Sequence, residues 1–214
     1  MPPKFIRKKN RLPYPQIYQS NNSFFVTICV QDRKCIFVEE TPTFPTSTST
    51  FDINNIIQNE WLNIAKYYSN VVLDEFVIMP NHFHGVISFN KTPIANISQK
   101  NTNLSKIIST FKTITTKKIK ELVISYNNGN VGCGNNGNVG VSATIDLIKN
   151  YGTIWQKSFY DHVVRNEKDL QRVQEYIFNN PLKWELDILN PVNDNKFQLW
   201  IKNKKSNSQP KMEG

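Results

Sequence analysis

Two apolar runs separated by a Pro-Asn pair constrain the fold of this chain more than any other feature. The runs "VVLDEFVIM" (71–79) and "HFHGVISF" (82–89) are rich in β-branched and aromatic residues, as strands are. Pro80 and Asn81 between them are typical turn residues. The pattern therefore predicts a β-hairpin, and with it an antiparallel sheet.

Further elements are predicted on both sides of this hairpin from composition and apolar spacing. They are strands over 23–30 and 153–164, and helices over 51–68, 104–122 and from about Glu167 onward. Asn166 is the expected N-cap of the last helix, with Asp169 at position N3, and Pro181 is expected to end it. The order predicts an α+β fold, a ferredoxin-like (βαββαβ) antiparallel sheet with helices on one face, plus an additional C-terminal helix.

The organisation along the chain is expected to be one domain with extensions. Residues 23–190 form the predicted domain, 1–22 a basic arm and 191–214 a polar tail. Residues 127–142 contain "NNGNVG" twice, and this Asn/Gly composition predicts a flexible insertion.

The charge of the chain indicates a polyanionic partner. The formal net charge is +9, and nucleic acid is the usual partner of such a surplus, although a basic protein without that partner has the same composition. Cys29, Cys35 and Cys133 have no C-x-x-C spacing, which argues against a disulfide framework or a structural zinc site. With no signal peptide and no apolar run of about 18–20 residues, a cytoplasmic location is expected and no membrane partner.

His82 and His84 are two of the three histidines of the chain. Side chains alternate along a strand, so both histidines share the face that points away from the predicted helices, whereas Phe83 points toward them. Two imidazoles at positions i and i+2 can converge on one cation. The same spacing also describes a hydrogen-bonded structural pair, and the motif alone leaves both interpretations open.

The last helix offers two further candidates. Leu170, Val173 and Ile177 form its apolar stripe, and Tyr176 and Asn180, four residues apart, lie at the edge of that stripe. Tyr176 could act as a nucleophile beside an oxygen ligand from Asn180. Alternatively, Tyr176 is a boundary residue of an amphipathic helix and Asn180 caps the chain before Pro181.

Three ordered blocks resemble the REP-associated tyrosine transposases, which belong to the HUH class of single-tyrosine transposases. The blocks are "MPNHFHGV", "WQKSFYDHVVRNE" and "YIFNNPLK", and the likeness extends over roughly 23–188. The Asn/Gly insertion and Trp184-Glu185, where the family usually has small residues, depart from the pattern.

The resemblance implies a ferredoxin-like enzyme that cuts and rejoins single-stranded DNA, at hairpin-forming repeats, through a 5′-phosphotyrosine. Tyr176 would be the nucleophile, and His82, His84 and Asn180 would bind a divalent cation. Two imidazole nitrogens and an amide oxygen suit Mn²⁺ better than Mg²⁺, although Mg²⁺ is abundant in cells. The protein would act as a monomer or homodimer, and associate with the nucleoid when bound to DNA.

Basic residues outside this centre are candidates for contacts with DNA phosphates. They are Arg7, Lys8, Lys9 and Arg11 in the arm, and Lys112, Lys117 and Lys118 in the second predicted helix. A solvated tail and a solvated helix face are the alternatives for these two groups. Tyr160 and His162 are expected to have structural roles.

Two rival functions remain at this point. An RRM-like protein would bind single-stranded nucleic acid on the same kind of sheet without chemistry, although the RNP1 pattern is absent. A histidine-based metal hydrolase would cleave without a protein–DNA bond and would use Tyr176 only structurally.

Overall fold

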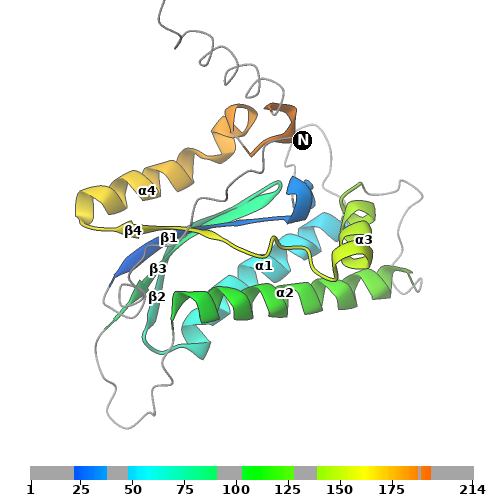
Figure 1. The fold of residues 1–214 in the computed structure, drawn as a ribbon, viewed down its shortest axis with the longest axis horizontal. Helices are drawn as coiled ribbons and strands as arrows, with labels where there is room; N and C mark the ends of the chain where they lie inside the picture. Colours follow the sequence, from blue (N-terminus) through cyan, green and yellow to red (C-terminus); the bar gives the residue numbers. More distant parts are fainter. Residues whose placement is uncertain (1–21, 38–47, 91–102, 128–138, 188, 194–214) are drawn as a thin grey trace, which may run out of the picture.

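A four-stranded antiparallel sheet in the order β2-β3-β1-β4 forms the centre of the protein (Figure 1). The computed structural model describes residues 22–37, 48–90, 103–127, 139–187 and 189–193. The strands are β1 (Ser23–Cys29), β2 (Val71–Met79), β3 (His82–Phe89) and β4 (Tyr160–Val164). Because β3 pairs with both β1 and β2, the sheet contains the split βαβ unit of the ferredoxin-like arrangement, which confirms the predicted fold class.

Helices cover both faces of the sheet. The first layer holds α1 (Thr48–Tyr67) and α2 (Leu104–Asn127), with α3 (Val139–Tyr151) packed against both of them, whereas α4 (Glu167–Asn179) crosses the opposite face (Figure 1). Short 3₁₀ helices follow β1 and α4, namely η2 (Gln31–Arg33), η3 (Pro181–Leu186) and η4 (Pro191–Asn193). No helix in the part of the chain that the structure describes is long and apolar enough to cross a membrane.

The main core lies between the sheet and the α1–α2 layer. The ring of Trp61 in α1 packs at a tilt of 55° against Phe83 of β3, with centroids 4.6 Å apart, and Phe111 of α2 packs against both rings. All three side chains are almost fully buried. Phe83 therefore points toward these helices, as the alternation of β3 predicts.

Gly85 of β3 lets Trp61 approach the strand closely. A Cβ atom at residue 85 would stand 2.5 Å from Cζ2 of Trp61 and 2.9 Å from Cε1 of Phe83. We expect Gly85→Ala to lower the free energy of unfolding by about 2–3 kcal/mol, because a buried indole cannot move aside cheaply. Urea unfolding of the single variants and of Gly85→Ala combined with Trp61→Leu measures this clash. Strict additivity in the double variant would contradict it.

A second, smaller core attaches α4 to the opposite face. Val86 of β3 and Val164 of β4 pack against Val173 and Ile177 of α4, all of them buried. The predicted N-cap is confirmed, since the side chain of Asn166 accepts a hydrogen bond from the backbone N–H of Asp169. The apolar stripe of α4 thus fixes which side of the helix meets the sheet.

A polar contact with β2 also holds α4. The ladder between β2 and β3 is irregular between Leu73 and Phe76, and Asp74 lies in this irregular stretch. Its Oδ1 accepts a hydrogen bond of 2.9 Å from Nε2 of Gln174, one residue beyond Val173. Together with the small core, this contact sets the position of the neighbouring Tyr176.

Two predictions from the sequence differ from the structure. The region 139–151 forms α3, which the sequence analysis did not anticipate, and residues 139–142 therefore belong to a helix and not to the expected flexible insertion. The predicted strand 153–164 is regular only from Tyr160 to Val164. Before Tyr160, the ammonium group of Lys112 donates hydrogen bonds to the backbone carbonyls of Gln156 and Ser158. These carbonyls are therefore not available to the sheet ladder.

Several predictions fall outside the described residues. They concern most of the basic arm (1–21), residues 128–138 of the Asn/Gly insertion, and most of the C-terminal tail (194–214).

Candidate active site

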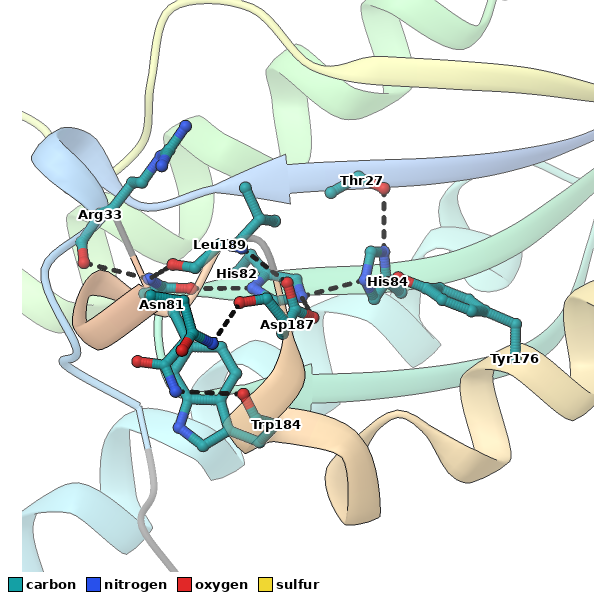
Figure 2. Close-up of polar contacts among 11 residues, drawn as sticks. Thr27, Arg33, Asn81, His82, His84, Tyr176, Trp184, Asp187 and Leu189 are labelled. Carbon is teal, nitrogen blue, oxygen red and sulfur yellow. Dashed lines mark hydrogen bonds and ion pairs between the residues drawn. The ribbon is translucent and has the colours of Figure 1, made fainter. Parts of the chain in front are cut away.

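The two histidines of β3 point their Nε2 atoms at one another. The distance from Nε2 of His82 to Nε2 of His84 is 2.9 Å (Figure 2). The residues are 0% and 3% exposed, because α4 and the segment that follows it cover this face of the sheet. The histidines do stand on the face away from α1 and α2, as predicted, but they are enclosed in the protein.

Asn81, in the hairpin turn, determines the tautomer of His82. Its side-chain nitrogen donates to the backbone carbonyls of Arg33 and Leu189, at 3.1 and 2.7 Å. Its oxygen therefore faces Nδ1 of His82, at 2.8 Å, and an amide oxygen only accepts. The hydrogen-bond network thus assigns the proton of His82 to Nδ1 and leaves a lone pair on Nε2.

Thr27 of β1 is the hydrogen-bond partner of Nδ1 of His84. Thr27 and His84 are paired across the β1–β3 ladder, and the Thr27 hydroxyl lies 2.8 Å from Nδ1. A hydroxyl can donate or accept, whereas the Val26 carbonyl, which also acts on His84, can only accept. Both tautomers of His84 satisfy these neighbours. With its proton on Nε2, His84 donates to the lone pair of His82, and with its proton on Nδ1 both Nε2 lone pairs are available to a cation.

Burial keeps both imidazoles neutral. It lowers the pKa of His82 to about 2, with a further contribution from the neighbouring His84. It lowers the pKa of His84 to about 3, against an opposing interaction with the Val26 carbonyl. Neutral imidazoles are the form that binds metal ions, so the pair is ready to act as ligands at any physiological pH.

Tyr176 of α4 brings its hydroxyl close to the histidine pair. Its hydroxyl lies 3.5 Å from Nε2 of His84, at the outer limit of a hydrogen bond. Its ring packs edge-on against Phe25, which in turn stacks on His84 at 5.1 Å. Burial and the charge of Asp187 raise the pKa of the phenol, and the amide of Asn180 acts in the opposite direction. The phenol is 48% exposed as a residue, so solvent and ligands can reach it.

Asn180 is buried at the junction of α4 and η3. The residue is 3% exposed, and its side chain makes no capping hydrogen bond to η3. Its amide nitrogen has no hydrogen-bond partner within the described residues. This nitrogen is a hydrogen-bond donor, and the side chain is close enough to Tyr176 to lower the pKa of the phenol, so a role beside the tyrosine fits it better than one as a helix cap.

The segment after α4 closes the site over His82. Trp184 of η3 lies beside the His82 ring, with centroids 6.0 Å apart, and its carbonyl accepts a hydrogen bond from the side chain of Asn190. Asp187 then brings its Oδ2 to 3.8 Å from Nε2 of His82 (Figure 2). Burial raises the pKa of Asp187, opposed by the Leu189 N–H and by the charge of Arg33. The departure from the family pattern at Trp184 thus lies against the site.

The site contains residues that the sequence analysis missed. Asn81 could have been suspected from its position directly before His82, and Thr27 from a correct strand register. Nothing local distinguishes Asp187 from the other carboxylates of the chain. Only the return of the chain after η3 brings it to the histidines.

The predicted basic contacts of α2 lie on the other side of the sheet from Tyr176. Lys112 donates hydrogen bonds to two backbone carbonyls, and the ammonium of Lys118 lies 2.6 Å from the buried carboxylate of Glu60. Lys117 is 78% exposed, 4.0 Å from Glu121. Lys112 and Lys117 border a cavity of about 370 Å³ next to α3. The structure therefore does not bring these lysines together with the histidine pair.

The remaining histidine, for which the sequence predicts a structural role, contacts α4. His162 of β4 lies 3.1 Å from Asp169 of α4, through Nε2 and Oδ2. The contact joins β4 to the first turn of the helix.

The donor set of this site fits a divalent cation. Two ligand atoms at right angles around an ion, each about 2.1 Å from it, are about 3 Å apart, close to the observed separation of the two Nε2 atoms. Asn180 lies close enough to act on Tyr176, but the atom without a partner is its amide nitrogen, a hydrogen-bond donor, and only its oxygen could bind a cation. In the described parts of the chain, no three His, Cys, Asp or Glu side chains stand close enough together to hold a metal ion as they lie, so a third ligand beside the two histidines is either an amide oxygen or a carboxylate that moves inward.

The chain is similar to several known proteins. An uncharacterised protein of Haemophilus influenzae is 29% identical over 174 residues, which are 80% of this chain and 87% of that protein. A REP-associated tyrosine transposase bound to a REP hairpin has a TM-score of 0.41 at 16% identity, over 81% of this chain and 74% of the other. A Deinococcus radiodurans protein described provisionally as a transposase has a TM-score of 0.38 at 15% identity, over 80% and 97%. No protein-family model matches the chain.

Proposed function

We propose that this protein is a transposase-like enzyme of the HUH single-tyrosine type that cuts and rejoins single-stranded DNA. The observation that carries the proposal is a phenol from α4 whose oxygen lies 3.5 Å from Nε2 of His84, beside two histidines of β3 whose Nε2 atoms are 2.9 Å apart. A nucleophile beside a cation-binding pair is the arrangement that phosphoryl transfer requires. The sequence blocks that resemble REP-associated tyrosine transposases contribute these same side chains.

The reaction would be a transesterification. The Tyr176 oxygen forms a bond to the scissile phosphorus, the bond from phosphorus to the 3′ oxygen breaks, and that oxygen leaves as a 3′-hydroxyl. The product is a 5′-phosphotyrosine that stores the ester until a 3′-hydroxyl attacks it. The phenol proton must be lost, and solvent water that reaches the partly exposed tyrosine would accept it, since Nε2 of His84 is a proposed ligand of the cation.

The phenol needs electrostatic help to react. With an ordinary pKa near 10, about one phenol in a thousand is ionised at pH 7, a cost of roughly 4 kcal/mol. Burial raises the pKa of Tyr176 further. When bound by His82, His84 and Asn180, a divalent cation, Mn²⁺ or Mg²⁺, would supply positive charge to offset the charge that develops on the phosphate.

Single-stranded DNA, in particular hairpin-forming repeats, is the proposed substrate. The net charge of +9 supports a polyanion, and the hairpin preference rests on the family resemblance. A cytoplasmic protein that associates with the nucleoid is part of the same proposal.

The RRM-like alternative has less support from the geometry. An RRM stacks bases on aromatic residues of its open sheet face. Here α4 crosses that face, and His82, His84 and Val86 of β3 on it are buried.

A covalent adduct is the decisive test of this function. We expect wild-type protein, incubated with a hairpin-bearing single-stranded oligonucleotide and Mn²⁺, to form a slower-migrating species on a denaturing gel. EDTA should suppress the species, and His82→Ala should reduce it by at least about 100-fold, because a ligand to the cation is lost. A double-stranded oligonucleotide of the same sequence is the substrate control. Failure of every hairpin tested, or equal yields from His82→Ala, would contradict the proposal.

A further inference from the structure

The carboxylate of Asp187 lies on the metal-binding side of the histidine pair. We infer that Asp187 is a further protein ligand of the cation, so that the site contains two imidazoles and one carboxylate. This inference rests on the proposed function, because the cation itself belongs to that proposal. It assigns a role to a residue seven positions beyond Asn180, in a segment where the sequence analysis named no site residue.

The two oxygens of Asp187 have different environments. Oδ1 accepts a hydrogen bond of 2.7 Å from the backbone N–H of Leu189, which holds the turn after η3. Oδ2 points to His82, at 3.8 Å from Nε2, and the side chain is only 8% exposed. The turn therefore fixes the carboxylate through one oxygen and presents the other to the site (Figure 2).

The nitrogen that Asp187 faces excludes an ordinary supporting role. Carboxylates that orient a metal-binding histidine accept a hydrogen bond from the ring nitrogen away from the metal. In His82 that nitrogen is Nδ1, and Asn81 already occupies it at 2.8 Å. Asp187 approaches Nε2 instead, the nitrogen that also faces His84. A carboxylate in this position can bind the same cation as the two histidines.

The separation agrees with a shared ion. Around an octahedral ion with ligands at about 2.1 Å, adjacent ligand atoms are about 3.0 Å apart and opposite ones about 4.2 Å. The distance of 3.8 Å from Oδ2 to Nε2 of His82 lies between these limits, so a shift of well under 1 Å brings the carboxylate to either position. Such a shift falls on a turn and not on a regular element.

The charge balance also favours a cation here. A carboxylate enclosed beside two neutral imidazoles is unfavourable unless positive charge compensates it, and the charge of Arg33 does so only in part, since burial still raises the pKa of Asp187. A divalent cation would provide further positive charge, and two imidazoles with one carboxylate leave three octahedral positions open. Those positions are enough for the Asn180 amide, a phosphate oxygen and water.

Mn²⁺ binding to the full-length protein tests the inference without DNA. We expect Asp187→Asn to weaken the affinity for Mn²⁺ at least tenfold in isothermal titration calorimetry of EDTA-treated, desalted protein. The amide keeps an oxygen for the Leu189 N–H, so thermal unfolding in EDTA should be unchanged. Glu185→Gln, which removes the same charge from an exposed residue of η3, is the matched control and should stay within twofold of wild type.

The absorption spectrum of bound Co²⁺ is a second readout, because it reports the ligand set directly. Its visible bands should shift in Asp187→Asn and remain unchanged in Glu185→Gln. Unchanged Mn²⁺ affinity and Co²⁺ spectrum in Asp187→Asn, together with loss of binding in His82→Gln, would overturn the role of Asp187 and leave the proposed function standing. Wild-type affinity in both variants would overturn the cation site itself, and with it this inference.

Discussion

Tyr176→Phe is expected to abolish the covalent protein–DNA species, with a loss of at least about 1000-fold in its yield. The substitution removes only the hydroxyl that lies 3.5 Å from Nε2 of His84. The ring remains, together with its edge-on packing against Phe25, so the fold and the small core should be unaffected. Denaturing gels of wild type and variant with the same hairpin oligonucleotide and Mn²⁺ measure the effect.

Tyr67→Phe is the matched control for this experiment. Tyr67 is 57% exposed, close to the 48% of Tyr176, but it ends α1 on the opposite side of the sheet. The control should form the adduct as wild type does. Equal adduct yields from Tyr176→Phe and wild type would show that another group is the nucleophile. Cleavage without an adduct in Tyr176→Phe would favour the metal-hydrolase alternative.

Acidification of the metal-free protein is expected to reduce its stability by roughly 3–4 kcal/mol between pH 7 and pH 5 through the two histidines. Their pKa values in the folded protein are about 2 and about 3, against 6.5 for an ordinary imidazole. Below pH 6.5 the unfolded chain takes up two protons that the folded chain does not. The free energy of unfolding therefore falls as the pH falls, and the loss continues toward the folded-state pKa values.

Urea unfolding in EDTA at several pH values measures this linkage. The double variant His82→Gln, His84→Gln removes both groups, so the difference in slope between wild type and variant isolates their contribution from that of the carboxylates. A wild-type slope that the double variant retains in full would contradict neutral, buried imidazoles. Mn²⁺ should add to the stability of wild type at pH 7 and still at pH 5, because the folded imidazoles stay neutral above about pH 3.

Local patterns in the sequence predicted much of the fold. The Pro80-Asn81 turn between two apolar runs defines the hairpin, and the period of two along β3 separates Phe83 from His82 and His84. The cap at Asn166 and the apolar stripe of α4 were also readable. These features depend on interactions between near neighbours in the chain, which the sequence displays directly.

Other elements depended on contacts that local patterns do not encode. The region after the Asn/Gly repeats forms α3 because it packs against α1 and α2. The stretch before β4 is irregular because two of its backbone carbonyls accept hydrogen bonds from the ammonium of Lys112 and not from a neighbouring strand. Both outcomes are decided by partners more than ten residues away.

The sequence by itself determined which side chains the candidate site contains and on which face of its strand or helix each one lies. It supplied two imidazoles at a spacing of two, and a phenol and an amide at a spacing of four, because strand and helix periods are local properties. Only the tertiary structure decided that these groups meet. The packing of Val86 against Val173 and the bond from Gln174 to Asp74 set α4 across the histidines. The turn at Leu189 directs Asp187 toward them, since side chains a hundred residues apart are brought together by packing and not by period.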